Sequence, residues 1–208
     1  MSALVLVRHA QSTAFESNSD RLSAIGEQQA ICLGQYWQAQ GVHFDEVYTG
    51  TMQRHIRTAE LAGFSHFTAQ AEFNEYDAPG ILRANPEYAP AMDNRQLQKQ
   101  FEKMMPLWIA GKLASPDVES WTVFRERILR GLHRIIDLEA PTRRIVVFTS
   151  GGPIGVAVQT VLQAPEPVAI EINWRIKNCS LTEFVFTRGR ISLDTFNATP
   201  HLRDVTFR

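Results

Sequence analysis

The chain alternates short apolar runs with longer segments in which apolar residues recur at helical spacing. Strands are predicted at residues 4–8, 46–49 and 145–148, and helices at residues 24–40, 52–61, 121–138 and 154–162. Two further apolar runs, 179–187 and 190–196, flank Arg188-Gly189 and are typical of a β-hairpin. Strands that alternate with helices predict an α/β fold. We expect a three-layer sandwich with a mainly parallel sheet and one antiparallel edge strand.

The alternation of strands and helices is interrupted between residues 77 and 120. In this region short helical stretches are separated by prolines, namely Pro79, Pro86, Pro90, Pro106 and Pro116. Such a composition favours a helical cap inserted between strands. With 208 residues, 44% of them hydrophobic, the chain suits one well-cored domain over residues 1–208. The cap would then be an insertion at about 77–120 within that domain.

Charge and cysteine content narrow the function classes. The net charge is −1 with acids and bases interspersed, which argues against a nucleic-acid partner or an anionic membrane surface. No segment approaches the roughly 18 apolar residues of a membrane span, so we expect a cytoplasmic protein. Cys32 and Cys179 form no framework, and the six histidines show no HExxH or HxH pairing. We therefore expect no metal and no cofactor.

Three turns that follow predicted strands carry polar residues suited to binding an anion. Arg8 and His9 end the first strand, Arg54 follows the second, and Ser150-Gly151-Gly152 follows the strand at 145–148. In open α/β sheets ligands bind at the carboxyl ends of the strands, so these turns should converge. Two guanidiniums can grip a phosphoryl group, and a glycine turn at a helix N-terminus offers backbone N–H groups to it.

Four segments, LVLVRHAQS, DRLSAIGEQQA, YTGTMQRHIRTAE and VVFTSGGPI, resemble in order the histidine phosphatase superfamily, in its phosphoglycerate-mutase-like branch. The family's Arg-His-Gly signature corresponds to Arg8-His9-Ala10. Its Ser-x-x-x-Arg-x-x-x-Thr segment corresponds to residues 50–58, with Gly50 in place of the serine. The resemblance implies the expected fold and a phosphohistidine chemistry that needs no metal.

By that resemblance His9 is the phosphorylated nucleophile, Arg8 and Arg54 hold the phosphoryl oxygens, and Glu75 is the acid that protonates the leaving oxygen. An unprotonated imidazole nitrogen can attack phosphorus once the other N–H is held. Further candidates for contact with substrate are Gln11, Ser12, Arg57 and Gly151, of which the first two closely follow the nucleophile. Ser150 is the remaining candidate for a catalytic residue.

One departure from the family bears directly on activity. The second histidine of the family falls on Ser150, whose hydroxyl donates only a neutral hydrogen bond. Loss of one preorganised donor typically lowers the rate by about 10²–10³. Arg57, one helical turn from Arg54, and the adjacent His55 are the two residues that could bring a replacement cation to the same oxygens.

The leading hypothesis is a phosphomonoester hydrolase that acts on a small phosphorylated substrate or a phosphopeptide. A non-catalytic phosphate-ligand-binding protein is the alternative, because Ser150 could have abolished turnover, and a phosphoglycerate-type mutase is a weaker third. Sugar phosphates, phosphoserine or phosphohistidine peptides and nucleotide monophosphates all remain open as substrates. The edge strand at 190–196 could pair across a homodimer.

Overall fold

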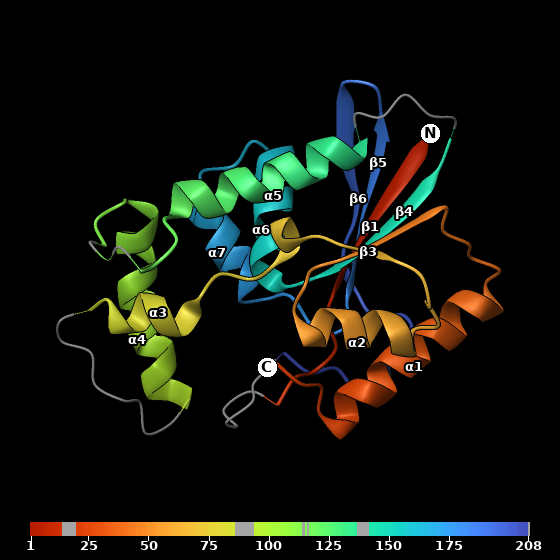
Figure 1. Ribbon diagram of the computed structural model, residues 1–208, viewed down its shortest axis with the longest axis horizontal. Helices are drawn as coiled ribbons and strands as arrows, with labels where there is room; N and C mark the ends of the chain where they lie inside the picture. The colour runs from red at the N-terminus through yellow and green to blue at the C-terminus, as the bar shows by residue number, and fades with distance from the viewer. Residues whose placement is uncertain (14–19, 86–93, 114, 116, 137–141, 208) are drawn as a thin grey trace.

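A computed structural model describes residues 1–13, 20–85, 94–113, 115, 117–136 and 142–207, and these build one six-stranded sheet (Figure 1). The strand order is β3-β2-β4-β1-β5-β6. The parallel strands are β1 (Ser2–Arg8), β2 (Glu46–Thr49), β3 (Thr68–Ala69) and β4 (Arg144–Thr149). Next to β1, β5 (Leu181–Thr187) runs antiparallel and pairs with β6 (Arg190–Ala198).

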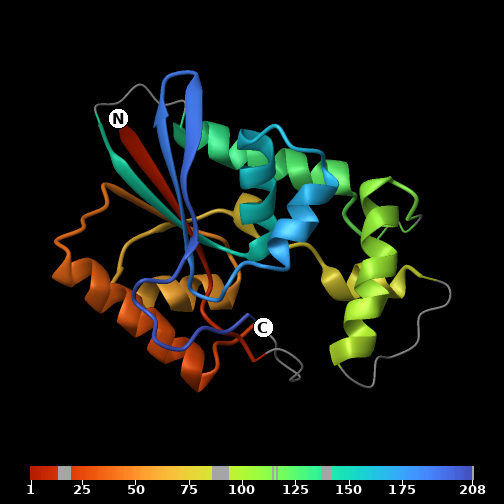
Figure 2. The same cartoon turned by 180° about the vertical axis from the view of Figure 1, so that it is seen from behind.

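Helices cover both faces of the sheet, which confirms the predicted three-layer sandwich (Figures 1 and 2). Side chains of β1 alternate between two hydrophobic clusters. Val5 and Val7 pack with α1 (Ala24–Ala39) and α2 (Gln53–Leu61). Leu4 and Leu6 pack with α5 (Trp121–Ile136) and α6 (Gly151–Val161). A strand buried on both faces must be apolar throughout, as residues 4–7 are.

Several details differ from the sequence prediction. The antiparallel edge holds two strands, because the predicted hairpin adds both β5 and β6 to the same side of β1. Helix α6 begins at Gly151, three residues earlier than predicted. Three short elements were not predicted, namely β3, a 3₁₀ turn at Ala71–Phe73 and α7 (Pro167–Asn173). Each is too short for hydrophobic periodicity to reveal. Residues 137 and 138 of the helix predicted at 121–138 lie outside the described part.

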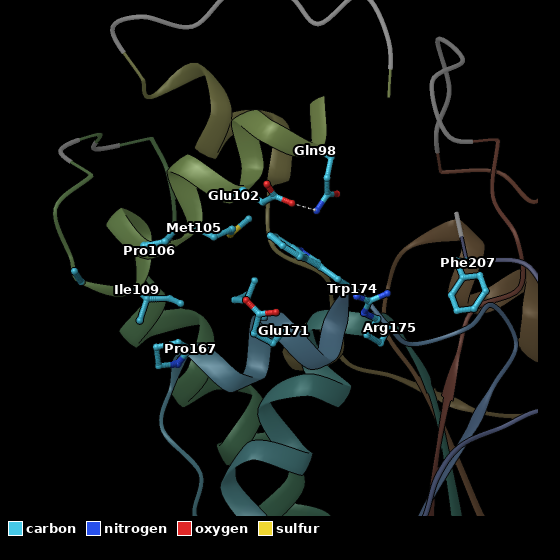
Figure 3. Close-up of a pocket in the computed structure, with 12 residues that line it drawn as sticks. Gln98, Glu102, Met105, Pro106, Ile109, Pro167, Glu171, Trp174, Arg175 and Phe207 are labelled. Carbon is cyan, nitrogen blue, oxygen red and sulfur yellow. Dashed lines mark hydrogen bonds between the residues drawn. The ribbon is translucent and has the colours of Figure 1, made fainter. Parts of the chain in front are cut away.

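The region expected to form the cap contains α3 (Ala78–Arg83) and α4 (Asn94–Ile109). Helix α4 continues past Pro106, which lies near its C-terminal end, where a missing N–H removes only one late hydrogen bond. Pro86, Pro90 and Pro116 lie outside the described residues. A cavity of about 790 Å³ separates α4 from α7, as Figure 3 shows.

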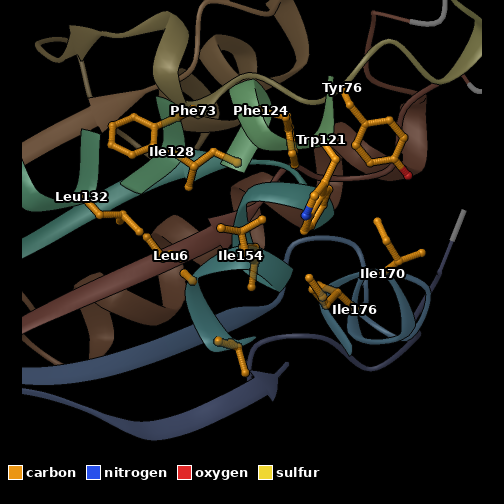
Figure 4. Close-up of a cluster of buried hydrophobic side chains, with 14 of the residues drawn as sticks. Leu6, Phe73, Tyr76, Trp121, Phe124, Ile128, Leu132, Ile154, Ile170 and Ile176 are labelled. Carbon is orange, nitrogen blue, oxygen red and sulfur yellow. The ribbon is translucent and has the colours of Figure 1, made fainter. Parts of the chain in front are cut away.

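The cap shares a hydrophobic cluster with the sheet layers, and Figure 4 shows the part of this cluster around Leu6, Phe124 and Ile154. Trp108 of α4 is buried, and its indole N–H donates to the Glu119 carbonyl oxygen at 2.8 Å. Its ring lies 5.1 Å from that of Tyr76 and 5.3 Å from that of Trp121, centroid to centroid. Because Trp121 begins α5, Trp108 ties the cap directly to a helix of the sheet layer.

We therefore expect the cap and the sheet to unfold in one cooperative transition. Trp108→Ala should lower the free energy of unfolding by about 3–5 kcal/mol, since it empties a large buried site. Trp108→Phe should cost less because it keeps most of the ring contacts. Denaturant unfolding followed by tryptophan fluorescence and by far-UV circular dichroism checks this prediction. Two separated transitions in the unmodified protein would contradict it.

Candidate active site

The site is organised by the parallel pairing of β1 with β4. In this register Arg8 lies opposite Thr149, and the His9 N–H donates to the Thr149 carbonyl oxygen at 2.8 Å. The residue that follows β4 in the chain is Ser150, the N-cap residue of α6. Both strands therefore end at the same level, and His9 and Ser150 come out side by side at the carboxyl edge of the sheet.

The imidazole of His9 is buried and held in one orientation. Its Nδ1 lies 2.7 Å from the Ala10 carbonyl oxygen, which can only accept, so Nδ1 carries the hydrogen and Nε2 carries the free lone pair. Burial, followed by the charges of Arg54 and Arg8, holds the pKa of His9 well below its usual value. The ring is thus neutral, as a nucleophile must be.

Arg8 and Arg54 supply the positive charge around this ring. The Arg8 guanidinium is buried and donates to the Ile176 carbonyl oxygen. Arg54 pairs with Asp20 at 2.9 Å, and the same carboxylate accepts from the Gln53 backbone N–H at the start of α2. The charges of both arginines lower the pKa of His9, so both act on this ring electrostatically.

Glu75 lies at the same edge of the sheet, in the turn between the 3₁₀ helix and α3. Its Oε2 accepts from the Gly152 backbone N–H at 3.0 Å, and its Oε1 accepts from the Tyr76 N–H at 3.2 Å. Burial raises the pKa of Glu75 above its ordinary value, although the Gly152 hydrogen bond and the arginine charges oppose the shift. Glu75 therefore stays protonated to a higher pH than an exposed glutamate.

The two glycines of the turn after β4 have different neighbours. A Cβ at Gly152 would lie 2.0 Å from Glu75 Oε1, so only glycine allows the carboxyl group to approach. A Cβ at Gly151 would lie 2.0 Å from Asn173 Oδ1. Sequence reasoning expected this turn to offer its N–H groups to the phosphoryl group. Instead the Gly152 N–H binds Glu75, and Gly151 accommodates Asn173.

A histidine of α2, His55, lies beside Ser150. His55 is buried, and its Nε2 lies 2.6 Å from Ser150 Oγ. The ring centroids of His55 and His9 are 5.7 Å apart. Burial and the charge of Arg54 hold the pKa of His55 well below its usual value. His55 thus reaches the place considered for it in the sequence, but as a neutral imidazole and not as a cation.

The remaining predicted residues are engaged elsewhere. Arg57 is half exposed and pairs with Glu27 and Glu60, on the outer side of α2. The Gln11 side chain accepts from the Ser23 hydroxyl at 2.8 Å, near the N-terminus of α1. Ser12 forms an isolated backbone bridge with Leu22. Contact of these three residues and of Gly151 with substrate stays a prediction.

The sequence of the chain settles its family. The family model of the histidine phosphatase superfamily (branch 1) matches residues 4–199. The chain belongs to this superfamily. Among curated proteins, none matches it by sequence.

Three solved structures are similar in fold to this chain. A phosphoserine phosphatase from Entamoeba histolytica is 20% identical, with a TM-score of 0.67 over 97% of this chain and 100% of that chain. A mycobacterial glucosyl-3-phosphoglycerate phosphatase is 19% identical, with a TM-score of 0.69 over 95% and 100%. A phosphoglycerate mutase from Bacillus anthracis is 17% identical, with a TM-score of 0.71 over 96% and 94%. At these identities the likeness shows the fold.

No group of three or more histidine, cysteine, aspartate or glutamate side chains that could hold a metal occurs in the described part of this histidine phosphatase chain. Among the helices that the structure describes, none is long and apolar enough to cross a membrane.

Arg127 of α5 supports the backbone of the site, a role that the sequence did not reveal. Its guanidinium binds both carboxylate oxygens of Glu119, at 2.7 and 2.9 Å. It also donates to the carbonyl oxygens of Glu72 and Asn74, at 2.9 and 2.8 Å. This fork fixes the backbone directly before Glu75. On the sequence Arg127 is one of several arginines along a helix, so nothing local marks it.

We expect Arg127→Lys to lower kcat by about tenfold or more, because a single ammonium cannot replace the fork and small misplacements of an acid are costly. Arg130→Lys is the matched control, since Arg130 lies on the same helix with an exposed side chain. Steady-state kinetics on an alkyl phosphate, with melting temperatures of both variants, checks the prediction. Equal kcat values for the two variants would contradict it.

Proposed function

We propose that this histidine phosphatase superfamily member is a metal-independent phosphomonoester hydrolase that works through a phosphohistidine on His9. The observation that carries the proposal is the orientation of the His9 ring. Its Nδ1 hydrogen is held by the Ala10 carbonyl oxygen, so the lone pair on Nε2 is free for attack. Arg8 and Arg54, which both act on this ring electrostatically, are suited to hold the oxygens of a phosphoryl dianion.

In the first step Nε2 of His9 forms a bond to phosphorus as the bond from phosphorus to the leaving oxygen breaks. The leaving oxygen takes the proton of Glu75 and departs as an alcohol. In the second step water attacks the phosphohistidine, and the Glu75 carboxylate accepts a proton from that water. Inorganic phosphate leaves, the Nε2 lone pair is restored and Glu75 is again protonated.

The pKa values of the two groups suit these roles. The low pKa of His9 keeps the nucleophile unprotonated, and the raised pKa of Glu75 keeps a proton available for the leaving group. Both shifts arise chiefly from burial, which disfavours a positive charge on the imidazole and a negative charge on the carboxyl group. One buried environment therefore lowers the pKa of the nucleophile and raises the pKa of the acid.

The cavity between α4 and α7 is lined by none of the predicted site residues, and the chain from Trp174 to Ile176 connects it with Arg8. Trp174 and Arg175 line it (Figure 3). These two residues directly precede Ile176, whose carbonyl oxygen accepts from Arg8. The lining combines apolar surface from Met105 and Trp174 with three charged side chains, which are those of Glu102, Glu171 and Arg175.

The nucleophile is tested by trapping the intermediate. Enzyme mixed with an aryl phosphate and quenched rapidly should carry acid-labile, base-stable phosphate, and peptide mapping should place it on His9. His9→Ala should abolish this label and reduce turnover to the rate of the uncatalysed reaction. His133→Ala, on the exposed side of α5, is the control and should keep both.

Turnover that survives in His9→Ala would overturn the proposal. Absence of turnover in the unmodified protein, together with tight binding of phosphate, would identify the chain as a phosphate-ligand-binding protein instead. Transfer of the phosphoryl group to a second position of the substrate would identify a mutase.

The acid is tested by the leaving group and by pH. Glu75→Gln should lower kcat/KM by about 10²–10⁴ for an alkyl phosphate, whose leaving oxygen needs a proton. For an activated aryl phosphate the loss should be much smaller. In the unmodified protein kcat/KM should stay high as the pH falls through 6.5, because the His9 pKa is lowered, and should decline on the alkaline side as Glu75 ionises. That alkaline decline should vanish in Glu75→Gln, and equal losses for both substrates would contradict the assignment.

A further inference from the structure

Three residues, Ser150, His55 and Gly50, pack together in the structure, which the sequence does not show. Ser150 lies at the end of β4, His55 comes from α2, and Gly50 comes from the turn between β2 and α2. His55 Nε2 lies 2.6 Å from Ser150 Oγ. A Cβ on Gly50 would lie 2.2 Å from His55 Nδ1 and 2.9 Å from its Cε1, which no real Cβ atom tolerates. The glycine therefore provides the space in which the His55 ring lies.

Resting on the proposed phosphatase reaction, we propose that Ser150 is a catalytic hydrogen-bond donor to the transferring phosphoryl group, and that His55 is the residue that positions and polarises its hydroxyl. Gly50, Ser150 and His55 would then form one unit, in which an imidazole contributed by α2 supports the reaction from beside β4. No covalent bond to Ser150 or His55 forms or breaks in this role.

The first support is the position of Ser150. It follows Thr149, whose carbonyl oxygen accepts from the His9 N–H, so its hydroxyl lies at the level of the nucleophile. Ser150 is fully buried and is the N-cap residue of α6, yet its side chain caps no helical N–H. An N-cap serine ordinarily accepts from the second or third N–H of its helix. The hydroxyl is instead directed to His55.

The second support is the tautomer of His55. Within the described residues Nδ1 of this ring has no hydrogen-bond partner. A buried N–H without a partner is the rarer defect, so the favoured tautomer carries its hydrogen on Nε2. Nε2–H then donates to Ser150 Oγ, which leaves the serine hydrogen free to point away from His55. A hydroxyl that accepts a hydrogen bond is polarised into a better donor.

The third support is electrostatic. His55 lies close enough to His9 and Arg54 for their charges to interact, and burial with Arg54 lowers its pKa. A cationic imidazole here would add a third positive charge to those of the two arginines. A neutral imidazole that acts through a hydroxyl supplies a directed donor without that repulsion.

The test combines single and paired substitutions. His55→Leu and Ser150→Ala should each lower kcat by about 10²–10³ with little change in KM, which is the usual loss for one preorganised donor. The double variant should be no slower than either single variant, because the two residues act as a unit. His55→Gln should recover most of the loss, since its amide N–H can replace Nε2–H.

Ser150→His should have opposite effects on kcat in the unmodified protein and in a variant that lacks His55. Ser150→His in the unmodified protein should lower kcat, because His55 already fills the space beside Ser150. In the His55→Ala background the same Ser150→His change should raise kcat. Gly50→Ala should lower kcat more when His55 is present than in a His55→Ala background, where the Nδ1 and Cε1 contacts are gone and the 2.8 Å contact with Asn74 Oδ1 remains. Melting temperatures of all variants separate loss of activity from loss of fold.

Binding of metavanadate and of orthophosphate makes the result independent of turnover. Metavanadate adopts the five-coordinate geometry of phosphoryl transfer, so His55→Leu and Ser150→Ala should weaken its binding at least tenfold while orthophosphate binding changes less than threefold. Unchanged metavanadate affinity in a folded His55→Leu variant overturns the inference, as do additive effects of the two single substitutions. A merely structural role would weaken both ligands alike and would give no rescue by glutamine.

The same measurements distinguish the inference from the function on which it rests. If the unmodified protein neither turns over nor labels His9, the proposed hydrolase fails, and the metavanadate affinities still decide whether Ser150 and His55 form a donor pair. If His9 is labelled and turnover is normal in folded His55→Leu, the hydrolase stands and the inference fails.

Discussion

The parallel pairing of β1 with β4 is the constraint on which the rest of the site depends. It ends two buried strands at the same level, so the residue after each strand emerges at one edge of the sheet. On one side this residue is His9, and on the other it is Ser150. Each strand is apolar on both faces and contributes to both hydrophobic clusters. A shift of one residue would exchange the faces of every side chain in the strand.

Burial is the second organising feature, because it acts on acids and bases in opposite directions. The pKa values of the two imidazoles are lowered, whereas the pKa of the Glu75 carboxyl group is raised. The charges of Arg8 and Arg54 reinforce the first effect and limit the second. In the proposed reaction, an incoming phosphoryl group would meet fixed positive charge together with uncharged reactive groups. This combination provides electrostatic stabilisation without protonating the nucleophile.

Glu75 is positioned from two sides of the molecule. The Gly152 N–H holds its carboxylate from the start of α6, and Arg127 holds the backbone before it from α5. Trp108 in turn joins the cap to Tyr76, the residue after Glu75. The acid of the proposed reaction is thus connected to the sheet, to one covering helix and to the cap. Distant substitutions can change its position without touching a substrate.

The sequence by itself determined the α/β architecture, the three principal parallel strands, the long helices and the family, because each is written in local periodicity and in short motifs. It also indicated His9, Arg8, Arg54 and Glu75. It did not separate His55 from Arg57 as a neighbour of Ser150. Which of them faces inward depends on how α2 is rotated against the sheet, and successive helical positions differ by about 100°. The close approaches of Gly152 to Glu75 and of Gly50 to His55 were likewise decided only by the tertiary structure. A glycine shows that a side chain is missing, and only packing shows which neighbour occupies the space.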